Sequence, residues 1–303
     1  MKNRGKLLIL GGTGFIGYHV AKKAIKEGFS VTSVSKNFPK KERFLKKVNY
    51  IRVNISKSHL IKKKVNKNFK YIINLAGYVD HSNKKETFIS HYVGCKNLAN
   101  YFLNKKIKLF IQIGSSMEYG RTQSPQKESV NCKPLSNYAK AKFFATQYLL
   151  NLYKKNNFPV VIFRLYQIYG PKQDLNRFIP ITINSCKNDK EFSCSHGKQI
   201  RDFLYIDDLV DALFLALGNK KVLGKIINIG SGEKLTIKFI IKKIINYYNL
   251  GKPKFNQIKL RKEEIMKVFP DLTNAKKILK WRPKISFRQG LKKTLNYYNA
   301  QKY

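Results

Sequence analysis

The sequence has few acidic residues. Its 303 residues include 17 Asp and Glu against 61 Lys and Arg, which gives a formal net charge of +44 at pH 7. Such a charge is typical of nucleic-acid-binding proteins and basic tails. However, hydrophobic residues make up 43% of the chain, and this content excludes the weakly hydrophobic, highly charged class of disordered proteins. We therefore expect a folded protein with a basic surface.

Arginine is scarce, because only 10 of the 61 basic residues are Arg. The lysines are spread along the chain in pairs such as Lys22-Lys23, with the densest patch at Lys62-Lys63-Lys64. A nucleic-acid surface usually gathers its basic residues on one element and uses arginine as the bidentate phosphate ligand. The dispersed lysines therefore predict solvated helix faces and no nucleic-acid partner.

Cysteine is also rare. The four cysteines, Cys95, Cys132, Cys186 and Cys194, form no CxxC pair and have no histidine at a spacing suited to zinc. We expect reduced thiols and no metal site.

Long hydrophobic runs are absent from the sequence. The first apolar run, residues 7–10, ends at Gly11 and is shorter than the roughly 7–15 residues of a signal-peptide core. No window approaches the roughly 18 apolar residues that a membrane-spanning helix needs. We expect a cytoplasmic protein that does not enter a membrane.

Short apolar runs alternate with longer helical patterns, and this alternation is typical of a parallel sheet with crossover helices. It predicts an α/β fold with a doubly wound parallel sheet. After about residue 166 the spacing of proline and glycine becomes irregular, which indicates a smaller C-terminal lobe. The expected strands are 6–10, 30–35, 49–53, 71–75, 109–113, 159–165 and 225–229, and the expected helices are 18–27, 87–103, 137–155 and 209–216.

A glycine-rich turn follows the first expected strand and opens a helix. Gly11, Gly14 and Gly17 stand at G-x-x-G-x-x-G spacing. Glycine at these positions permits a tight turn, close approach of a pyrophosphate to backbone N–H groups, and close packing of the helix on the strand. The context favours a dinucleotide-binding turn over a plain strand–turn–helix.

The second expected strand ends without a carboxylate. Dinucleotide folds that prefer NAD usually carry an acidic residue there, which accepts hydrogen bonds from the adenosine ribose. Here the position is Ser35, followed by Lys36, with Lys40, Lys41 and Arg43 nearby. The missing carboxylate favours NADP(H), with NAD as the alternative, although each lysine alone could belong to the general lysine excess.

Tyr138 and Lys142 stand four residues apart in an expected helix and therefore share one face. An ammonium group beside the phenol lowers the pKa of the tyrosine and makes it a better acid or base near pH 7. Ser115 and Ser116 follow the strand 109–113, so a hydroxyl would lie at the carboxyl edge of the sheet.

Seven motifs together resemble the extended short-chain dehydrogenases/reductases, in the branch of nucleotide-sugar epimerases, dehydratases and reductases. The resemblance implies a Rossmann domain over residues 1–165 and a nucleotide-sugar lobe over 166–303, with 200–230 partly returning to the first domain. It also implies a homodimer. The motifs, in order, are the glycine turn, Asn74-Leu75-Ala76-Gly77, Ser115–Gly120, Tyr138-x-x-x-Lys142, Arg164–Pro171, Arg201–Asp208 and Leu279–Pro283.

The resemblance assigns roles to particular residues. Tyr138 is the implied acid/base, Lys142 its partner and ribose ligand, and Ser115 the hydroxyl that polarises the sugar oxygen. Ser115 is preferred to Ser116 because it stands four residues before Tyr119. Further implied cofactor contacts are Thr13, Phe15, Ile16, Ser35, Lys36, Asn54, Ile55, Leu75, Ala76, Gly77, Leu165 and Ile168; implied substrate contacts are Ser116, Gln167, Asn176 and Phe178, with Arg201 and Arg261 on the diphosphate.

Two positions depart from the resemblance. Asn54 stands where the family often has an aspartate near adenine, and His91 where it commonly has asparagine. For His81 and His91 we expect structural or surface roles.

The residues after Ser115 help to separate the possible reactions. A 4,6-dehydratase needs an acid and a base next to the hydroxyl, but Met117 cannot transfer protons and Glu118 stands one place too late. Reduction of an NDP-4-keto-6-deoxyhexose, as in CDP-abequose-type reductases of deoxysugar and surface-polysaccharide synthesis, is the preferred interpretation. The alternatives are an NDP-hexose 4-epimerase with tightly bound NAD and, from another class, a non-catalytic NADP-sensing or RNA-associated protein.

Overall fold

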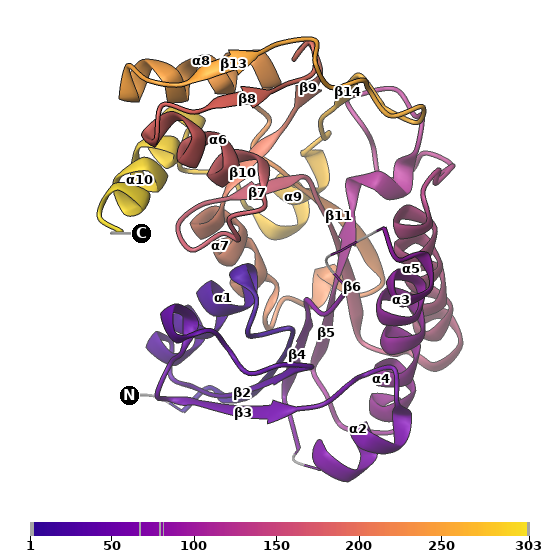
Figure 1. Cartoon of the computed structure of the whole chain (residues 1–303). Coiled ribbons are helices and arrows are strands. Elements are labelled where there is room, and N and C mark those ends of the chain that lie inside the picture. The colour runs from indigo at the N-terminus through magenta and orange to yellow at the C-terminus, as the bar shows by residue number, and fades with distance from the viewer. Residues whose placement is uncertain (1–2, 67, 79, 81, 302–303) are drawn as a thin grey trace.

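A seven-stranded sheet forms the centre of the molecule in a computed structural model that describes residues 3–66, 68–78, 80 and 82–301 (Figure 1). All neighbouring strands are parallel, in the order β11-β6-β5-β4-β1-β2-β3, which confirms the predicted Rossmann-type fold. His81 lies outside the described residues. The strands are β1 (Gly5–Leu10), β2 (Phe29–Ser35), β3 (Val48–Arg52), β4 (Tyr71–Asn74), β5 (Leu109–Ser115), β6 (Val160–Leu165) and β11 (Lys225–Ile229).

Both faces of the sheet are covered, because successive side chains of each strand point to opposite faces. On one face Leu7 and Ile9 pack in a core with α1 (Phe15–Lys26) and α7 (Ile206–Ala216). On the other, Leu8 and Leu10 pack with α2 (Ser58–Lys64), α4 (Gly94–Phe102) and α5 (Asn137–Asn156). Strands buried on two sides explain why the sequence shows continuous apolar runs rather than alternation.

The strand order reverses beside β1. From β1 the chain proceeds to β2 and β3 on one side, whereas β4 pairs with β1 on the other. A doubly wound sheet binds its ligand in the crevice outside the carboxyl ends at such a point. The segments that follow β1, β4 and β5 carry most of the predicted site residues.

The helix expected over 87–103 is interrupted. It begins earlier, as α3 (Lys84–Phe88), passes through a π-helical segment η2 (Ile89–Val93) and continues as α4. π-helical insertions are rare and often stand at functional sites. The sequence pattern gave no sign of this interruption or of α2.

The second lobe lies above the main sheet in Figure 1. Two of the sequence motifs meet there: the Trp281 indole N–H donates to the Asp208 carbonyl at 3.2 Å, and the Asp208 carboxylate accepts from the N–H groups of Lys284 and Ile285. Both motifs therefore fasten the end of the chain to α7. The remaining elements are β7 (Gln167–Tyr169), α6 (Phe178–Lys187), β8 (Glu191–Ser193), β9 (Ile200–Arg201), β10 (Phe203–Tyr205), β12 (Leu235–Thr236), α8 (Ile237–Tyr248), β13 (Lys252–Lys254), β14 (Lys267–Val268), α9 (Thr273–Leu279) and α10 (Phe287–Asn299), with short 3₁₀ turns at Lys41–Arg43, Ser116–Tyr119 and Lys220–Val222.

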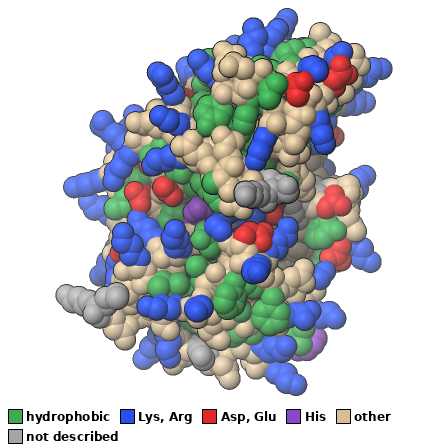
Figure 2. Space-filling model, turned by 60° about the vertical axis from the view of Figure 1, so that its left-hand side comes forward, with side chains coloured by type: hydrophobic (Ala, Val, Ile, Leu, Met, Phe, Trp, Pro, Cys, Tyr) green, Lys and Arg blue, Asp and Glu red, His purple; other side chains and the backbone are tan. Residues whose placement is uncertain are grey.

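The surface carries the basic charge broadly. Lys and Arg side chains are spread over the face shown in Figure 2 rather than gathered over one element. The four cysteines are free thiols, and the described residues contain no cluster of three or more His, Cys, Asp or Glu that could hold a metal ion. Within the described chain, no helix has the length and apolar character needed to cross a membrane.

One buried ion pair joins three elements below the crevice. The Glu118 carboxylate accepts from the Arg164 guanidinium at 2.9 Å and 3.0 Å, from the Thr146 hydroxyl at 2.9 Å and from the Ser115 N–H at 2.8 Å. The Glu118 and Arg164 side chains are 0% and 1% exposed. A charge removed from water needs such partners, so β5, α5 and β6 are held together at this carboxylate.

We predict that Glu118→Gln lowers the free energy of unfolding by about 3 kcal/mol or more, because it leaves the Arg164 charge buried without a counter-charge. Urea unfolding measures this loss. Glu118→Gln combined with Arg164→Met should be less destabilised than the sum of the two single variants. Additive losses would contradict the account.

Candidate active site at the carboxyl edge of the sheet

The glycine turn after β1 provides a cradle for a phosphate group. Gly11 has φ +76°, and a side chain at Gly17 would come within 2.4 Å of the Gly11 carbonyl. By contrast, a Cβ at Gly14 would meet only the Gly11 oxygen, at 3.4 Å. Helix α1 begins after Gly14 with no side-chain cap among the described residues and no acidic residue in its first turn. A helix N-terminus of this kind suits the pyrophosphate of a dinucleotide.

Thr13, Phe15 and Ile16 are the other predicted cofactor contacts in and after this turn. Thr13 donates its N–H to the Ser35 hydroxyl at 3.4 Å, which ties the turn to the end of β2. Phe15 is 9% exposed and packs in the core, so its backbone is the part that faces the turn, while Ile16 is half-buried against the same core.

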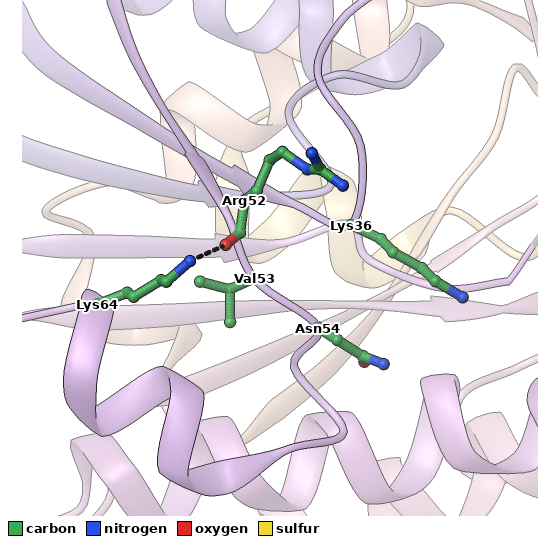
Figure 3. Close-up of a pocket in the computed structure, with 5 residues that line it drawn as sticks. All are labelled: Lys36, Arg52, Val53, Asn54 and Lys64. Atoms are coloured by element: carbon green, nitrogen blue, oxygen red, sulfur yellow. Dashed lines mark hydrogen bonds between the residues drawn. The ribbon is translucent and has the colours of Figure 1, made fainter.

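A cavity of about 340 Å³ opens at the carboxyl ends of β2 and β3 (Figure 3). Its lining includes Lys36, Arg52, Asn54 and Lys64, and the Lys64 ammonium donates to the Arg52 carbonyl at 3.3 Å. The predicted Lys36 and Asn54 are therefore brought together, with two cations that the sequence analysis did not select. Ile55 is buried, and its side chain packs in the core.

Arg43 does not belong to the basic cluster that was expected around Lys36. Its side chain is 6% exposed and pairs with Asp174 at 2.8 Å, while it also donates to the Lys172 carbonyl. Arg43 thus fastens the 3₁₀ turn after β2 to the second lobe. Proximity in sequence to Lys36 did not predict proximity in space.

The loop after β4 faces the glycine turn. A Cβ at Gly11 would lie 3.0 Å from the backbone of Ala76, and Leu75 donates its N–H to the Leu10 carbonyl at 2.9 Å. Asn74 is buried, where it donates to Gln112 and accepts from the Ala76 N–H. The predicted Leu75, Ala76 and Gly77 therefore line the crevice opposite the turn.

Ser115, Tyr138 and Lys142 come together above β5. Tyr138 makes a side-chain hydrogen bond with Ser115. The Lys142 ammonium lies 5.9 Å from the centre of the Tyr138 ring and donates to the Ile113 carbonyl at 2.7 Å. Ser136 caps α5 by accepting from the Ala139 N–H at 3.2 Å, which fixes where the helix starts and hence which face carries the tyrosine.

The pKa of Tyr138 differs from the sequence-based expectation. Burial raises it, and this effect outweighs the hydrogen bond from Ser115 and the positive charge of Arg177, both of which lower it. Burial also lowers the pKa of Lys142 to about 8, against the opposing influence of Glu118. The lysine is therefore still mostly protonated at pH 7, but it loses its proton at a lower pH than an exposed lysine does. The i,i+4 spacing alone did not predict this effect of burial.

Glu118 lies next to the catalytic candidates but is not directed at them. Its carboxylate bonds to the Ser115 N–H and forms the buried pair with Arg164. Ser116 is 5% exposed, and Met117 offers no proton. Tyr138 is thus the proton-transfer group that the described geometry places beside the Ser115 hydroxyl.

Apart from Ser115 and Ser116, the predicted substrate residues lie on the second lobe. Arg201, on β9, forms an ion pair with Glu264 and donates to the carbonyls of Ile200 and Met266. The Arg261 carbonyl accepts from the Glu264 N–H at 2.9 Å, so the two predicted diphosphate ligands are linked through Glu264. Of the other substrate candidates, Gln167 and Asn176 are exposed and Phe178 is half-buried. Of the predicted cofactor contacts nearby, Ile168 is half-buried and Leu165 packs in the core.

Several residues at the site were missed. Glu118 had a sequence signal, because Ser115-x-x-Glu118 is a capping-box pattern and the structure contains that box. Arg177 precedes α6 and acts on Tyr138 through its charge. The ring of His91 lies 5.0 Å from the Tyr138 ring, so a residue expected to be structural contacts the candidate acid/base. Only the fold brings these last two to the tyrosine.

Comparison with known proteins places the chain among nucleotide-sugar enzymes. The profile of the "NAD dependent epimerase/dehydratase family" matches residues 7–230. A UDP-N-acetyl-alpha-D-glucosaminuronate decarboxylase of Bacillus cytotoxicus is 29% identical over 98% of both chains. A dTDP-D-glucose 4,6-dehydratase of Dictyostelium discoideum is 32% identical over 80% of this chain and 62% of that protein.

A crystal structure of a UDP-glucose 4-epimerase from Thermotoga maritima with UDP-glucose superposes with a TM-score of 0.89 at 25% identity. It covers 97% of this chain and 98% of that one. The similarity therefore includes the second lobe as well as the sheet. The narrower resemblance to CDP-abequose-type reductases stays a prediction.

We predict a pH-dependent stability contribution from Lys142. Its pKa is about 8 in the folded protein and 10.5 in its ordinary state. Between pH 8 and pH 10.5 the unfolded chain binds more protons at Lys142 than the folded protein does. The contribution of Lys142 to the free energy of unfolding therefore rises with pH, by up to about 3 kcal/mol. Below pH 8 both states are protonated, and the cost of burying the charge is fully present.

Unfolding of the wild type and of Lys142→Met at pH 7, 8.5 and 10 tests this contribution. The wild type should gain stability relative to the variant as the pH rises. Lys140→Met, on the exposed side of the same helix, serves as the control. A difference between wild type and Lys142→Met that does not change with pH would contradict the prediction.

Proposed function

The chain belongs to the NAD dependent epimerase/dehydratase family, and from this premise we propose that it interconverts nucleotide sugars that differ in configuration at C4 of the hexose. Such a reaction oxidises the C4 hydroxyl to a ketone and then reduces the ketone from its other face. Hydride and proton are both returned, so nothing is consumed. The sequence alone ranked net reduction above this epimerisation.

The proposal is supported by the observation that Tyr138 is the one proton-transfer group that the described residues place beside the Ser115 hydroxyl. Tyr138 hydrogen-bonds to Ser115, while the carboxylate of Glu118 is occupied by Arg164 and by the Ser115 N–H. Epimerisation at C4 needs a proton to leave and rejoin one oxygen only. Elimination of water from C5 and C6 needs a further acid and base, and Met117 cannot supply either. A 4,6-dehydratase activity like that of the Dictyostelium relative is therefore not the activity we propose.

The chain's own residues then have defined tasks. Ser115 and Tyr138 hydrogen-bond the C4 oxygen; Tyr138 takes the proton as the ketone forms and gives it back afterwards. Lys142 holds positive charge under the phenol in its protonated form. A bound nicotinamide dinucleotide supplies the hydride acceptor and donor. The uncapped start of α1 and the open space at Gly14 suit its pyrophosphate.

The adenosine end of the cofactor site supports NADP(H) over NAD. Position 35, at the end of β2, is a serine rather than an acidic residue. Lys36, Arg52 and Lys64 bring three positive charges to one cavity (Figure 3). A ribose 2′-phosphate is a dianion that such a cavity accommodates, whereas the hydroxyl-binding carboxylate typical of NAD sites is missing. The family description names NAD, so this preference is particular to the chain.

The same cavity favours a second candidate function. An enzyme that draws reducing equivalents from a pool of NADPH would reduce an NDP-4-keto-6-deoxyhexose at C4, as in deoxysugar or surface-polysaccharide synthesis. Tyr138 would then only donate its proton. The similarity to the Thermotoga 4-epimerase over nearly the whole chain is why we rank this candidate second.

We also propose a homodimer. Phe88, Tyr92 and Phe144 form an aromatic cluster on α3, η2 and α5, and Phe144 remains 44% exposed. A second copy packed on these helices would cover the cluster.

We predict that the purified protein converts UDP-glucose, or another UDP-hexose of a panel, into its C4 epimer without net change of cofactor. Tyr138→Phe should lower the rate by about 100-fold or more, because it removes the proton-transfer group. Chromatographic separation of the two epimers measures the conversion. Tyr148→Phe is the matched control. Tyr148 lies on the same helix as Tyr138, and its phenol donates a hydrogen bond to the Asn100 side chain on α4.

Stoichiometric NADPH oxidation with an NDP-4-keto-6-deoxyhexose, in the absence of any epimerisation, would contradict the first proposal and support the second. Full activity of Tyr138→Phe would overturn the role of the tyrosine in both.

We predict that NADP⁺ binds more tightly than NAD⁺, and that Lys36→Ala and Arg52→Ala each weaken NADP⁺ binding about 5-fold, the effect of losing roughly 1 kcal/mol from a solvent-accessible ion pair. NAD⁺ binding should change less. Raising the salt concentration should shrink the preference. Calorimetry measures the affinity of the wild type and of each variant for both dinucleotides. Lys41, an exposed cation outside the cavity lining, provides the control variant Lys41→Ala.

Tighter binding of NAD⁺ than of NADP⁺ would reject the assignment. Equal weakening of both dinucleotides by the two variants would show that the cations act on a group that the cofactors share.

A further inference from the structure

His91 occupies an unusual position next to the site. It stands in the middle of the π-helical segment η2, between α3 and α4, and its side chain is buried with 6% exposure. The mechanism proposed above does not use it. A buried imidazole at a π-helical insertion is a group whose task the fold itself does not explain.

Two consecutive residues of η2 hold the backbone of Tyr78. The Ser90 hydroxyl accepts from the Tyr78 N–H at 2.9 Å, and His91 Nε2 lies 3.2 Å from the Tyr78 carbonyl oxygen. Because a carbonyl can only accept, Nε2 carries a proton and donates it. Tyr78 directly follows Gly77, in the loop that lines the crevice after β4, so η2 fixes the position of this loop.

The same imidazole contacts the candidate acid/base. Its ring centre lies 5.0 Å from that of Tyr138, and the two planes meet at 81°, an edge-to-face arrangement. The Cε1–Nδ1 edge covers Gly77 closely, since a Cβ there would lie 1.9 Å from Cε1 and 2.3 Å from Nδ1. Glycine at position 77 is therefore what allows the ring to fit between the loop and the tyrosine.

We propose that His91 is a positioning residue, whose hydrogen bond to the Tyr78 carbonyl anchors its ring against Tyr138 and keeps the phenol in contact with Ser115. The inference rests on the role of Tyr138 in the proposed function. It adds a connection that the sequence resemblance does not supply, because the family commonly has asparagine at this position. Through it, the loop after β4 and the acid/base on α5 are held at a fixed separation.

A consequence for the acidity of Tyr138 follows from the contacts. The hydrogen bond from Ser115 and the charge of Arg177 lower the pKa of the phenol, while Glu118 and burial raise it. If the ring of His91 loses its anchor, the phenol moves away from Ser115 and one of the two lowering influences weakens. The pKa of Tyr138 should then rise, and catalysis should fall because the proton-transfer group is misplaced.

The test compares two replacements of His91. Gln reaches about as far as the imidazole and can donate to the Tyr78 carbonyl, whereas Phe keeps an aromatic ring of similar size but cannot donate. Anchoring predicts that His91→Gln retains more function than His91→Phe. A role in filling space alone predicts the reverse order. His59→Phe, on the exposed side of α2, controls for unspecific effects of replacing a histidine.

The readout that does not depend on a sugar substrate is NMR of the full-length protein labelled with ¹³C at the tyrosine Cζ. Comparison with Tyr138→Phe assigns the Tyr138 resonance, and titration gives its pKa. Ser115→Ala in the same experiment shows the shift caused by complete loss of the hydrogen bond. His91→Phe should give an upward shift in the same direction, and His91→Gln a smaller one.

A second variant covers the case in which His91→Phe fails to fold. In Gly77→Ala the new methyl group displaces the imidazole from the loop side without changing it, and the pKa of Tyr138 should again rise. Once an active sugar is known, kcat of His91→Phe should fall about 10- to 100-fold, the usual cost of a small misplacement of a catalytic group, with little change in KM.

The proposal is overturned if His91→Phe keeps both the tyrosine pKa and kcat of the wild type, or if it outperforms His91→Gln. An unchanged tyrosine pKa in Gly77→Ala would also count against it. Failure of the proposed function itself would appear differently, as a lack of effect of Tyr138→Phe on turnover while the NMR shifts remain.

Discussion

The buried carboxylate of Glu118 is the constraint on which the candidate site depends. It accepts from Ser115 on β5, Thr146 on α5 and Arg164 on β6, at distances between 2.8 and 3.0 Å. A fully buried charge is tolerated only when each of its lone pairs is satisfied, so these three elements can adopt only a narrow range of relative positions. Because Tyr138 and Lys142 are on α5 and Ser115 ends β5, the same bonds fix the hydroxyl, the phenol and the ammonium relative to one another.

Because the Glu118 carboxylate is paired with Arg164, it also limits which proton transfers the site can perform. A carboxylate that neutralises Arg164 is not available as a second base, which is consistent with the role that we propose for Tyr138 as the proton-transfer group. Around the tyrosine the protein adjusts acidity through opposing effects, since burial raises the pKa of the phenol while Ser115 and Arg177 lower it. The net charge of +44 contributes little to this balance. In the function that we propose, only a few cations have a direct role, above all Lys36, Arg52 and Lys64 at the cavity beside β3.

The sequence predicted the framework because apolar strands and glycine spacing are local signals. The strand Lys225–Ile229 has the predicted bounds, and α5, over Asn137–Asn156, ends one residue beyond the predicted range. The sequence pattern over 87–103 did not reveal the π-helical insertion, because the insertion spans only five residues, too few to show a period of its own. The strands of the second lobe are only two or three residues long, too short for an alternation to appear, whereas its longer helices α8 and α10 were left unassigned in the sequence-based prediction.

The site was predictable only where its residues follow a motif in the chain. Ser115, Tyr138 and Lys142, which the structure brings together, were selected as candidates because each belongs to a pattern. Arg52, Lys64 and His91 were not selected as candidates, since their proximity to Lys36 or Tyr138 is produced by the fold and leaves no spacing in the sequence. Arg43 was selected for its sequence proximity and proved to pair with Asp174 in another part of the molecule.

The fate of the C4 hydrogen tests the central claim most directly. A UDP-hexose that the protein accepts is prepared with deuterium at C4 and incubated in ordinary water, and both epimers are examined by mass spectrometry and NMR. Oxidation and reduction at C4 within one bound complex predict that the product keeps its deuterium at C4. Exchange of the deuterium with solvent, or its complete loss from the product, would contradict the account.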